Sequence, residues 1–184
     1  PTTPTDPLYV NQWHFPLLGD IETIWDEFTG AGVKVAVYDD GVQYTHPDLT
    51  NNYDASMHFT FGGVTYDPTP IDLVGDPTAD PVDYGDSHGT SVAGLIGSTE
   101  GNGIGGVGMA WGVSLTGVNF LSDIQFESNT VISAAIQHAA NFDIMNNSWG
   151  ITPLFGSYQN LTNPFAGQTL VNNEYEYVVE NGRG

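Results

Sequence analysis

The chain contains no cysteine among its 184 residues. A disulfide framework, a cysteine-ligated metal site and a thiol nucleophile are therefore excluded for these residues. Basic residues are almost as rare, since Lys34 and Arg183 stand against 22 acidic residues and the formal net charge at pH 7 is −20. A surface of this charge repels nucleic acids and anionic membranes, so neither is an expected partner.

Long apolar runs are also absent, and no hydrophobic segment approaches the length that crosses a bilayer. We therefore expect no membrane insertion. The chain starts Pro1-Thr2-Thr3-Pro4 without Met or a signal peptide, as a processed or truncated chain would. Aromatic residues make up 12% of the sequence, which argues against a disordered acidic tail. Length and composition fit one folded domain, and the excess of carboxylates suits cation binding.

The segment from Asp86 to Gly97 contains a candidate catalytic histidine at the start of an expected helix. Asp86 and Ser87 can cap a helix, and the apolar residues after them recur at a spacing typical of a buried helix. His88 falls in the first turn, where the helix dipole favours a neutral imidazole that can act as a base. A lone histidine is more often structural than catalytic, so both interpretations stay open at this point.

Residues 32–38 are apolar and β-branched behind a glycine boundary, which is typical of a buried parallel strand. This strand ends in Asp39, Asp40 and Gly41. Sites in open α/β sheets lie at the carboxyl ends of strands, so a carboxylate here is placed to orient a base. An ordinary Asp-Asp-Gly turn is an equally good alternative.

The remaining segments predict an α/β domain with a parallel sheet. Residues 1–20 are rich in proline and are expected to form an extended arm, and residues 62–86 a long connection. Helices are expected over 20–28, 130–141 and about 168–180, and strands over 58–61, 113–120 and 143–148.

The glycines at 101, 103 and 106 satisfy G-x-G-x-x-G by letter. A dinucleotide fingerprint follows a strand and opens a helix. This run follows a helix and leads toward a strand, so a dinucleotide site is rejected.

Three motifs in this order resemble the subtilisin-like serine proteases, and the kexin-like branch among them. They are Val35-Ala36-Val37-Tyr38-Asp39-Asp40-Gly41, His88-Gly89-Thr90-Ser91-Val92-Ala93-Gly94 and Asn147-Ser148-Trp149-Gly150. The segments typical of the kexin-like branch are Asp6-Pro7-Leu8, Gln12-Trp13-His14 and Thr29-Gly30-Ala31-Gly32-Val33. The resemblance covers about residues 6 to 150. It implies a three-layer α/β fold with helices on both faces of a mostly parallel sheet, incomplete at the C-terminal end. Residues 1–184 are then the N-terminal portion of one catalytic domain.

The resemblance also implies a role for each matched residue. Asp39 orients His88, and His88 is the base that takes the proton of a serine hydroxyl attacking a peptide carbonyl. Asp40 is implied to help form a substrate subsite. Ser148, Trp149 and Gly150 are implied to hydrogen-bond an extended polypeptide substrate through their main chain. A strand end with a core tryptophan is the alternative for this last motif.

The family's nucleophile motif, Gly-Thr-Ser followed by small residues and Pro, is absent from the chain. Ser91 lies three residues after His88 on the same expected helix, where it cannot reach a triad geometry. The oxyanion-hole asparagine is also missing, and neither Asn146 nor Asn147 matches it. We therefore expect the chain to be inactive alone and to need the C-terminal remainder of the catalytic domain as its partner.

Calcium binding is the second chemical property that the resemblance implies. Hard cations prefer several oxygen ligands, with carboxylates and carbonyls mixed. The implied Ca²⁺ site uses the carboxylates of Asp6 and Asp48, the Asn102 side chain and the carbonyls of Thr99, Ile104 and Gly106. A solvated acidic surface beside a Gly-rich loop is the alternative.

The leading hypothesis is part of the catalytic domain of a secreted, calcium-binding serine endopeptidase, with secretion inferred from the resemblance. The second is a non-catalytic subtilase-like module that binds peptide or calcium. The third is an acidic scaffold that calcium stabilises. A basic-residue specificity is less well supported, because the acidic residues that follow the Ser-Trp-Gly motif in kexin-like enzymes are missing from residues 150–155.

Overall fold

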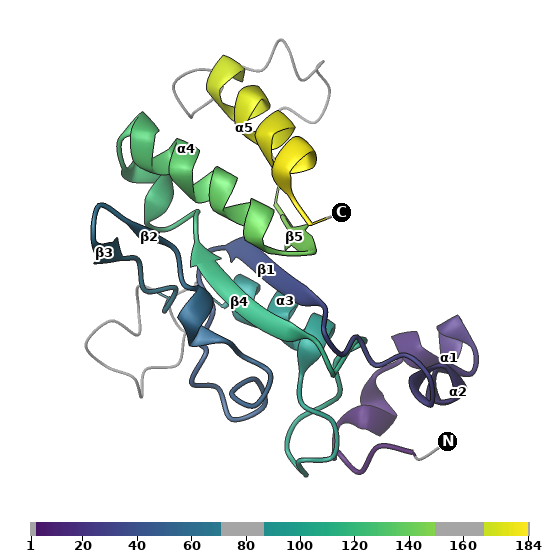
Figure 1. Ribbon diagram of the computed structural model, residues 1–184. Coiled ribbons are helices and arrows are strands. Elements are labelled where there is room, and N and C mark those ends of the chain that lie inside the picture. Colours follow the sequence, from purple (N-terminus) through teal and green to yellow (C-terminus); the bar gives the residue numbers. More distant parts are fainter. Residues whose placement is uncertain (1–2, 71–86, 150–167, 184) are drawn as a thin grey trace.

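A computed structural model describes residues 3–70, 87–149 and 168–183. Its centre is a parallel sheet in the order β4-β1-β5 (Figure 1). The three strands are β1 (Lys34–Asp39), β4 (Ser114–Asn119) and β5 (Ile144–Asn146). β4 pairs with the full length of β1, and β5 pairs with residues 35–37. Because the strands are parallel, Asp39 at the end of β1 lies at the carboxyl edge of the sheet.

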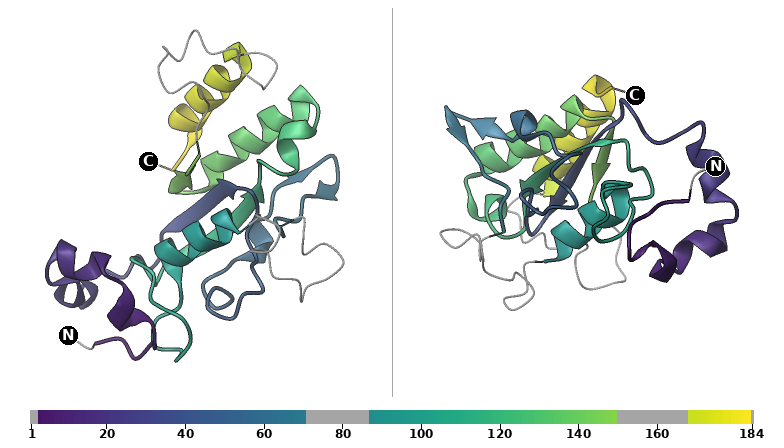
Figure 2. Two further views of the ribbon diagram at one scale, coloured as in Figure 1. Left: turned by 180° about the vertical axis from the view of Figure 1, so that it is seen from behind. Right: turned by 90° about the horizontal axis from the view of Figure 1, so that it is seen from below.

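Helices cover both faces of the sheet (Figures 1 and 2). One face carries α4 (Asn129–Gln137), with α5 (Gln168–Asn181) packed against it, and the other carries α3 (His88–Gly97). Side chains of a strand alternate between the faces, so Ala36 and Tyr38 join the α4 core while Val35 and Val37 join the α3 core. The three-layer arrangement with a parallel sheet is thereby confirmed.

The remaining elements are short. They are η1 (Tyr9–Asn11), α1 (His14–Leu18), α2 (Ile21–Trp25), η2 (Ala55–Met57), η5 (Ile124–Phe126), η6 (His138–Asn141) and the antiparallel pair β2 (Thr60–Phe61) and β3 (Val64–Thr65). Within the described ranges, no helix combines the length and apolarity needed to traverse a bilayer.

The expectation of an extended N-terminal arm is wrong, because η1 and α1 fold within residues 9–18. Pro16 falls in the first turn of α1, where the missing proline N–H costs no helical hydrogen bond. An aromatic cluster fixes the segment, with the Phe15 ring 5.4 Å from Tyr9 and 5.2 Å from Trp25, between centroids. Proline content therefore does not keep this segment extended.

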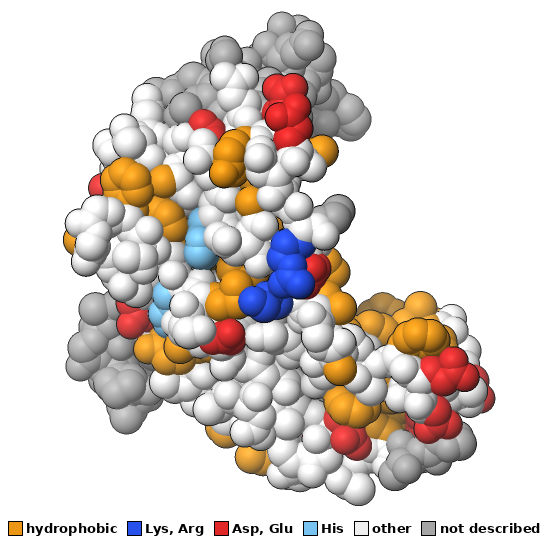
Figure 3. All heavy atoms as spheres, viewed as in Figure 1, with side chains coloured by type: hydrophobic (Ala, Val, Ile, Leu, Met, Phe, Trp, Pro, Cys, Tyr) orange, Lys and Arg blue, Asp and Glu red, His pale blue; other side chains and the backbone are white. Residues whose placement is uncertain are grey.

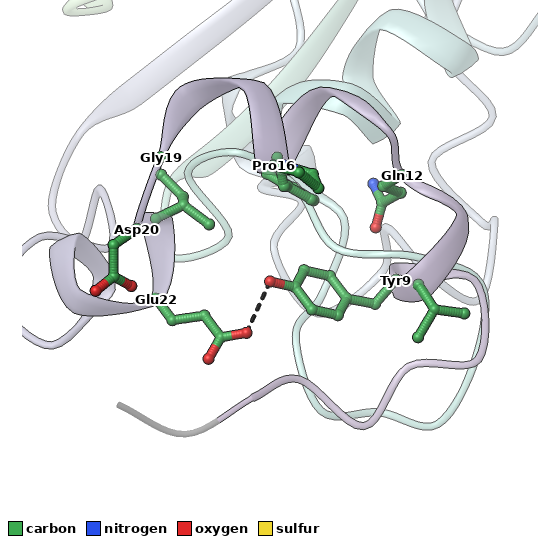
Figure 4. A pocket seen from close by; sticks show the side chains of 9 residues that line it. Tyr9, Gln12, Pro16, Gly19, Asp20 and Glu22 are labelled. Carbon is green, nitrogen blue, oxygen red and sulfur yellow. Dashed lines mark hydrogen bonds between the residues drawn. The ribbon is translucent and has the colours of Figure 1, made fainter.

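Two polar contacts complete the N-terminal segment. The hydroxyl of Tyr9 donates to Glu22 Oε1 at 2.9 Å beside a hollow of about 240 Å³ (Figure 4). Burial, followed by this hydrogen bond, raises the pKa of Tyr9 to about 12. Gln12 donates to the Val107 carbonyl and accepts the Val107 N–H, both at 2.8 Å. The amide of Gln12 therefore joins the N-terminal segment to the loop that follows α3.

Other expected elements exist with different boundaries. The helix expected over 20–28 ends at Trp25, and Phe28 is 70% exposed. The helix expected over 130–141 changes to a 3₁₀ turn at His138. The strand expected over 143–148 has three residues, and the connection expected over 62–86 contains β3 before residues 71–86, which lie outside the described residues.

Candidate active site

Asp39 and His88 meet at the carboxyl edge of the sheet. Asp39 is the last residue of β1 and His88 the first of α3, and His88 Nδ1 lies 2.8 Å from Asp39 Oδ1. A carboxylate oxygen only accepts, so Nδ1 carries the proton and Nε2 keeps its lone pair. Nε2 has no partner among the described residues, and the His88 side chain is 54% exposed. The expected contact is present, and it leaves a nitrogen free to act as a base.

The surroundings of the pair favour the protonated imidazole. The hydrogen bond to Asp39 is the largest cause that raises the pKa of His88, and the charges of Asp39 and Asp40 add to it against burial. Asp39 is buried, and its Oδ1 also accepts the Asp40 N–H at 2.9 Å. Its Oδ2 has no hydrogen-bond partner among the described residues. The buried negative charge is therefore available to stabilise an imidazolium that forms during a reaction.

Asp40 caps the helix that begins at His88. Its Oδ1 accepts the Gly89 N–H at 2.7 Å, and its Oδ2 accepts the His88 N–H at 3.1 Å. The first N–H groups of a helix have no intrahelical partner, and a carboxylate satisfies them and the positive end of the helix dipole. Two adjacent carboxylates of the β1 end thus hold the ring and the backbone of His88.

The cap expected from Ser87 is wrong, since the Ser87 side chain makes no capping hydrogen bond. Asp86, the other expected cap, lies outside the described residues. The signal that sequence reasoning missed is the second Asp of the Asp39-Asp40 pair. The expected role of Asp40 at a substrate subsite stays a prediction. Asp40 is 8% exposed.

Gly89 lets the helix and the strand end come close together. A Cβ at Gly89 would lie 2.2 Å from the Gly41 carbonyl oxygen and 2.7 Å from the Asp39 Cβ. Real Cβ atoms do not approach backbone oxygens so closely. Glycine at this position is therefore required for the contacts that Asp39 and Asp40 make with α3.

The third motif lies partly in the core. Trp149 donates from Nε1 to the Tyr38 carbonyl at 2.8 Å and stacks on Phe120 with centroids 5.6 Å apart. Ser148 accepts a hydrogen bond from the Asn146 amide at 2.9 Å. Gly150 lies outside the described residues. The packing of Trp149 agrees with the structural alternative, and the substrate-binding role of this motif stays a prediction.

The carboxylates of the expected calcium site lie against one loop. Asp6 and Asp48 are buried, with 3% and 4% exposure. Asp6 accepts N–H groups from Gly101, Asn102 and Gly103 at 2.8 to 3.2 Å. Asp48 accepts from the Asn102 amide at 2.9 Å and from the Gly106 N–H at 3.3 Å. The fold therefore gathers these members of the expected ligand set.

Some main-chain carbonyls of the loop after α3 accept hydrogen bonds and others do not. The carbonyls of Ser98, Gly105 and Val107 accept hydrogen bonds from other segments. Within the described residues, the three carbonyls expected as ligands accept none: Thr99, Ile104, Gly106.

A further polar atom of the loop also has no partner. The Oγ1 of Thr99 is buried without a hydrogen bond in the described part of the chain. Asn102 Oδ1 accepts the Ile104 N–H at 2.8 Å, which leaves one of its two lone pairs. Buried carboxylates beside unused carbonyl oxygens fit a hard cation.

The expected calcium site would take its ligands from main-chain oxygens as much as from side chains. The described residues contain no group of three or more His, Cys, Asp and Glu side chains placed to hold a metal. A site for a soft metal is therefore not indicated in these ranges, whereas mixed carboxylate and carbonyl oxygens suit calcium.

Comparisons with known proteins match the chain to one family of proteases. Residues 30–182 match the Subtilase family. Neuroendocrine convertase 2 of Homo sapiens is 33% identical over 159 residues, which cover 80% of this chain and 24% of the convertase. Furin-like protease 2 of Drosophila melanogaster is 35% identical over 154 residues, or 79% of this chain and 8% of that protease. The chain thus spans at most about a quarter of the length of these relatives.

Solved structures resemble the fold. The serine protease of Aeromonas sobria superposes with a TM-score of 0.59 at 30% identity, covering 80% of this chain and 23% of that one. A protease of Pseudoalteromonas arctica gives a TM-score of 0.60 over 98% of this chain and 57% of that one, and at 23% identity it supports the fold alone. The matched family and the convertase relatives together show that the chain belongs to the subtilase family, in its kexin-like branch.

Proposed function

We propose that this chain supplies the general base and its orienting carboxylate to a serine endopeptidase. The observation that supports the proposal best is the 2.8 Å contact between His88 Nδ1 and Asp39 Oδ1, in a histidine whose side chain is half exposed. A buried carboxylate behind a histidine with one exposed nitrogen is the arrangement that a serine nucleophile requires. Membership of the subtilase family supports the same reaction.

In the proposed reaction, His88 Nε2 takes the proton of a serine hydroxyl as its oxygen attacks the peptide carbonyl. The imidazolium is stabilised by Asp39 and then gives its proton to the leaving amine. In the second half, His88 takes a proton from water, whose oxygen attacks the acyl carbon. The bond from this carbon to the serine oxygen then breaks, the imidazolium returns its proton to that oxygen, and the carboxylic acid is released. The nucleophile serine and the oxyanion asparagine are proposed to come from the C-terminal remainder of the catalytic domain, outside these 184 residues.

The proposed substrate is a polypeptide in extended conformation. Asp40 and the main chain of Ser148, Trp149 and Gly150 are the groups proposed to contact it, by analogy with the family. By analogy with the family, whose relatives here are named neuroendocrine convertase 2 and furin-like protease 2, we propose that the chain acts in the secretory pathway or outside the cell.

We also propose a calcium ion at the loop of residues 99–106. Asp6 and Asp48 would supply the negative charge, and Asn102 and the unused carbonyls the neutral oxygens. A bound Ca²⁺ supplies a charge that neutralises two buried carboxylates. Its expected effect is on stability, because Asp6 belongs to the N-terminal segment and Asp48 to the loop after β1.

Complementation tests the proposed function. The purified chain of residues 1–184 is expected to hydrolyse peptides negligibly, and addition of the separately produced C-terminal remainder is expected to restore hydrolysis. The same mixture made with His88→Ala should stay inactive, and one made with His14→Gln should be active. Robust hydrolysis by the chain alone, verified by mass to end at Gly184, would contradict the proposal, as would an active His88→Ala mixture.

A further inference from the structure

A second cluster of polar side chains lies at the other end of the sheet. A cavity of about 450 Å³ opens at the start of β1, beside η2, η6 and Arg183, two residues beyond the end of α5. Its lining includes both basic residues and two of the five histidines of the chain: Lys34, Arg183, His58 and His138. Figure 3 shows the blue Lys and Arg atoms as one patch, with pale-blue histidine side chains on the same face. In a protein of net charge −20, all Lys and Arg charge is concentrated here.

Neither basic side chain is fully used by the protein. The Lys34 ammonium contacts no partner among the described residues, although its backbone N–H donates to Asp143 Oδ2 at 2.8 Å. Arg183 Nε lies 3.2 Å from Asp143 Oδ1, and the terminal guanidinium nitrogens have no partner in the described ranges. Asp143 therefore offsets one of the two positive charges and fixes the guanidinium. The remaining N–H donors stay available to a ligand.

His58 adds a neutral donor to the lining. Tyr53 Oη accepts the Gly117 N–H at 2.8 Å and lies 3.0 Å from His58 Nε2, to which its hydroxyl can donate. A ring that accepts at Nε2 carries its proton on Nδ1. Within the described residues this Nδ1–H has no partner. Lys34, Arg183 and His58 thus offer three kinds of donor to one cavity.

Two other side chains of the lining, His138 and Ser56, form hydrogen bonds within the protein. His138 donates from Nε2 to the Met57 carbonyl at 3.0 Å, and its Nδ1 lies 3.2 Å from the Asn141 amide nitrogen. Ser56 donates its backbone N–H and its hydroxyl to Asp54 Oδ1. These hydrogen bonds fix the positions of the side chains that form the wall of the cavity.

Burial favours the neutral form of both histidines in the lining of the cavity. Burial lowers the pKa of His138 and of His58. The negative charges of Asp67 and Asp54 oppose this shift at His58 without reversing it. His58 therefore offers a neutral N–H, and the positive charge of the cavity comes from Lys34 and Arg183.

We propose that this cavity binds a small oxyanion of the phosphate or sulfate class, held by the Lys34 ammonium, the Arg183 terminal nitrogens and the His58 Nδ1–H. Oxyanions accept short, charge-assisted hydrogen bonds from ammonium and guanidinium groups. The net charge of −20 repels nucleic acids, acidic peptides and anionic membranes over a long range. A small anion carries few charges, so repulsion by the net negative charge reduces its binding free energy least. A small anion is therefore the ligand that the charge distribution favours.

The cavity and Asp39 lie at opposite ends of β1, because Lys34 is its first residue and Asp39 its last. Five strand steps at about 3.3 Å each separate them by about 17 Å. A bound anion would contact Lys34 of β1, His58 just after η2 and Arg183, two residues beyond the end of α5. It would therefore link segments distant in sequence, and its expected effect is on stability instead of peptide hydrolysis.

Inorganic phosphate is the probe for this site. Its binding is measured by the ring ¹⁵N and ¹H shifts of His58 and by the melting temperature, at neutral pH and at ionic strength held constant with sodium chloride. Phosphate should shift the His58 signals and raise the melting temperature above the chloride reference. Lys34→Gln and Arg183→Gln should each weaken binding by about tenfold, the loss expected for one charge-assisted contact. Lys34→Arg keeps the charge and should keep most of the affinity, and His14→Gln, outside the cavity, should change nothing.

Several outcomes would overturn the proposal. Equal effects of phosphate and chloride at the same ionic strength would show general screening only. Undiminished phosphate binding by Lys34→Gln and Arg183→Gln would place the anion elsewhere. Tighter binding of an oligoglutamate peptide than of phosphate would mean that the cavity receives an acidic polypeptide. Loss of binding in Lys34→Arg, with a folded far-UV spectrum, would show that the positive charge of Lys34 is not what holds the anion.

Discussion

The Asp40 carboxylate accepts the Gly89 N–H at 2.7 Å, so the residue after Asp39 caps the helix that carries His88. Asp39 meanwhile binds the ring of the same histidine at 2.8 Å. The position of His88 relative to the sheet is therefore set by two neighbouring carboxylates, one on its side chain and one on its backbone.

Loss of the Asp40 cap should cost stability. Asp40→Ala leaves the His88 and Gly89 N–H groups without this acceptor, and a lost helix cap costs about 0.5–2 kcal/mol. Ser87→Ala is the matched control, because the Ser87 side chain caps nothing in the structure. The free energy of unfolding in urea checks both variants. A larger loss for Ser87→Ala than for Asp40→Ala would refute the assignment of the cap.

The His88 titration should depend on Asp39. The folded-state pKa of His88 is raised above its ordinary value of about 6.5, chiefly by the hydrogen bond to Asp39. The stability that the pair contributes is therefore fully present below the unfolded-state pKa and is lost as pH rises through the folded-state value. NMR titration should give a lower His88 midpoint in Asp39→Asn than in the wild type. An unchanged midpoint would exclude a strong interaction between the two side chains.

Calcium should raise the melting temperature of protein stripped of metal with EDTA. An ion that binds only the folded state stabilises it by mass action, by about 2.7 kcal/mol at a concentration one hundred times its Kd. Asp48→Asn should lose most of this gain, and Glu176→Gln, an exposed carboxylate on α5, should keep it. No response of the wild type to millimolar calcium would remove the proposed site.

Gly89 and Gly94, two of the three glycines of α3, should respond in opposite ways to alanine. Gly89→Ala places a methyl group 2.2 Å from the Gly41 carbonyl oxygen, so the helix start must move away from Asp39 and stability should fall. Gly94→Ala meets only the Ser98 hydroxyl at 3.4 Å, and alanine favours a helix over glycine by about 1 kcal/mol. Thermal unfolding compares the pair. Equal tolerance of both substitutions would contradict the close contact between α3 and the end of β1.

Strong local patterns predicted the main elements of the fold. The apolar run before Asp39 and the small residues after His88 identify β1 and α3, because burial on both sides leaves a pattern that sequence alone reveals. Local patterns did not predict the fold of the N-terminal segment. Its aromatic residues fold back against Trp25 and Val107, and these tertiary contacts outweigh the preference of proline for extended backbone.

The candidate site was also predictable only in part. The contact of Asp39 with His88 follows from two motifs at a strand end and a helix start. The cap by Asp40 does not, because it depends on how closely α3 approaches the strand, which Gly89 and Gly41 decide together. The shared cavity of Lys34 and Arg183 could not be predicted from the sequence either, since these residues are far apart along the chain and share no motif.

The central claim is that Asp39 and His88 perform the proton transfer of a serine endopeptidase. Its most direct test is kcat for peptide hydrolysis by a complete protease containing this chain, compared with its Asp39→Asn, His88→Ala and His14→Gln variants. Loss of either triad residue should lower kcat by about 10⁴–10⁶ with little change in KM, and His14→Gln should match the wild type. A His88→Ala enzyme whose kcat stays within about tenfold of the wild type would contradict the account.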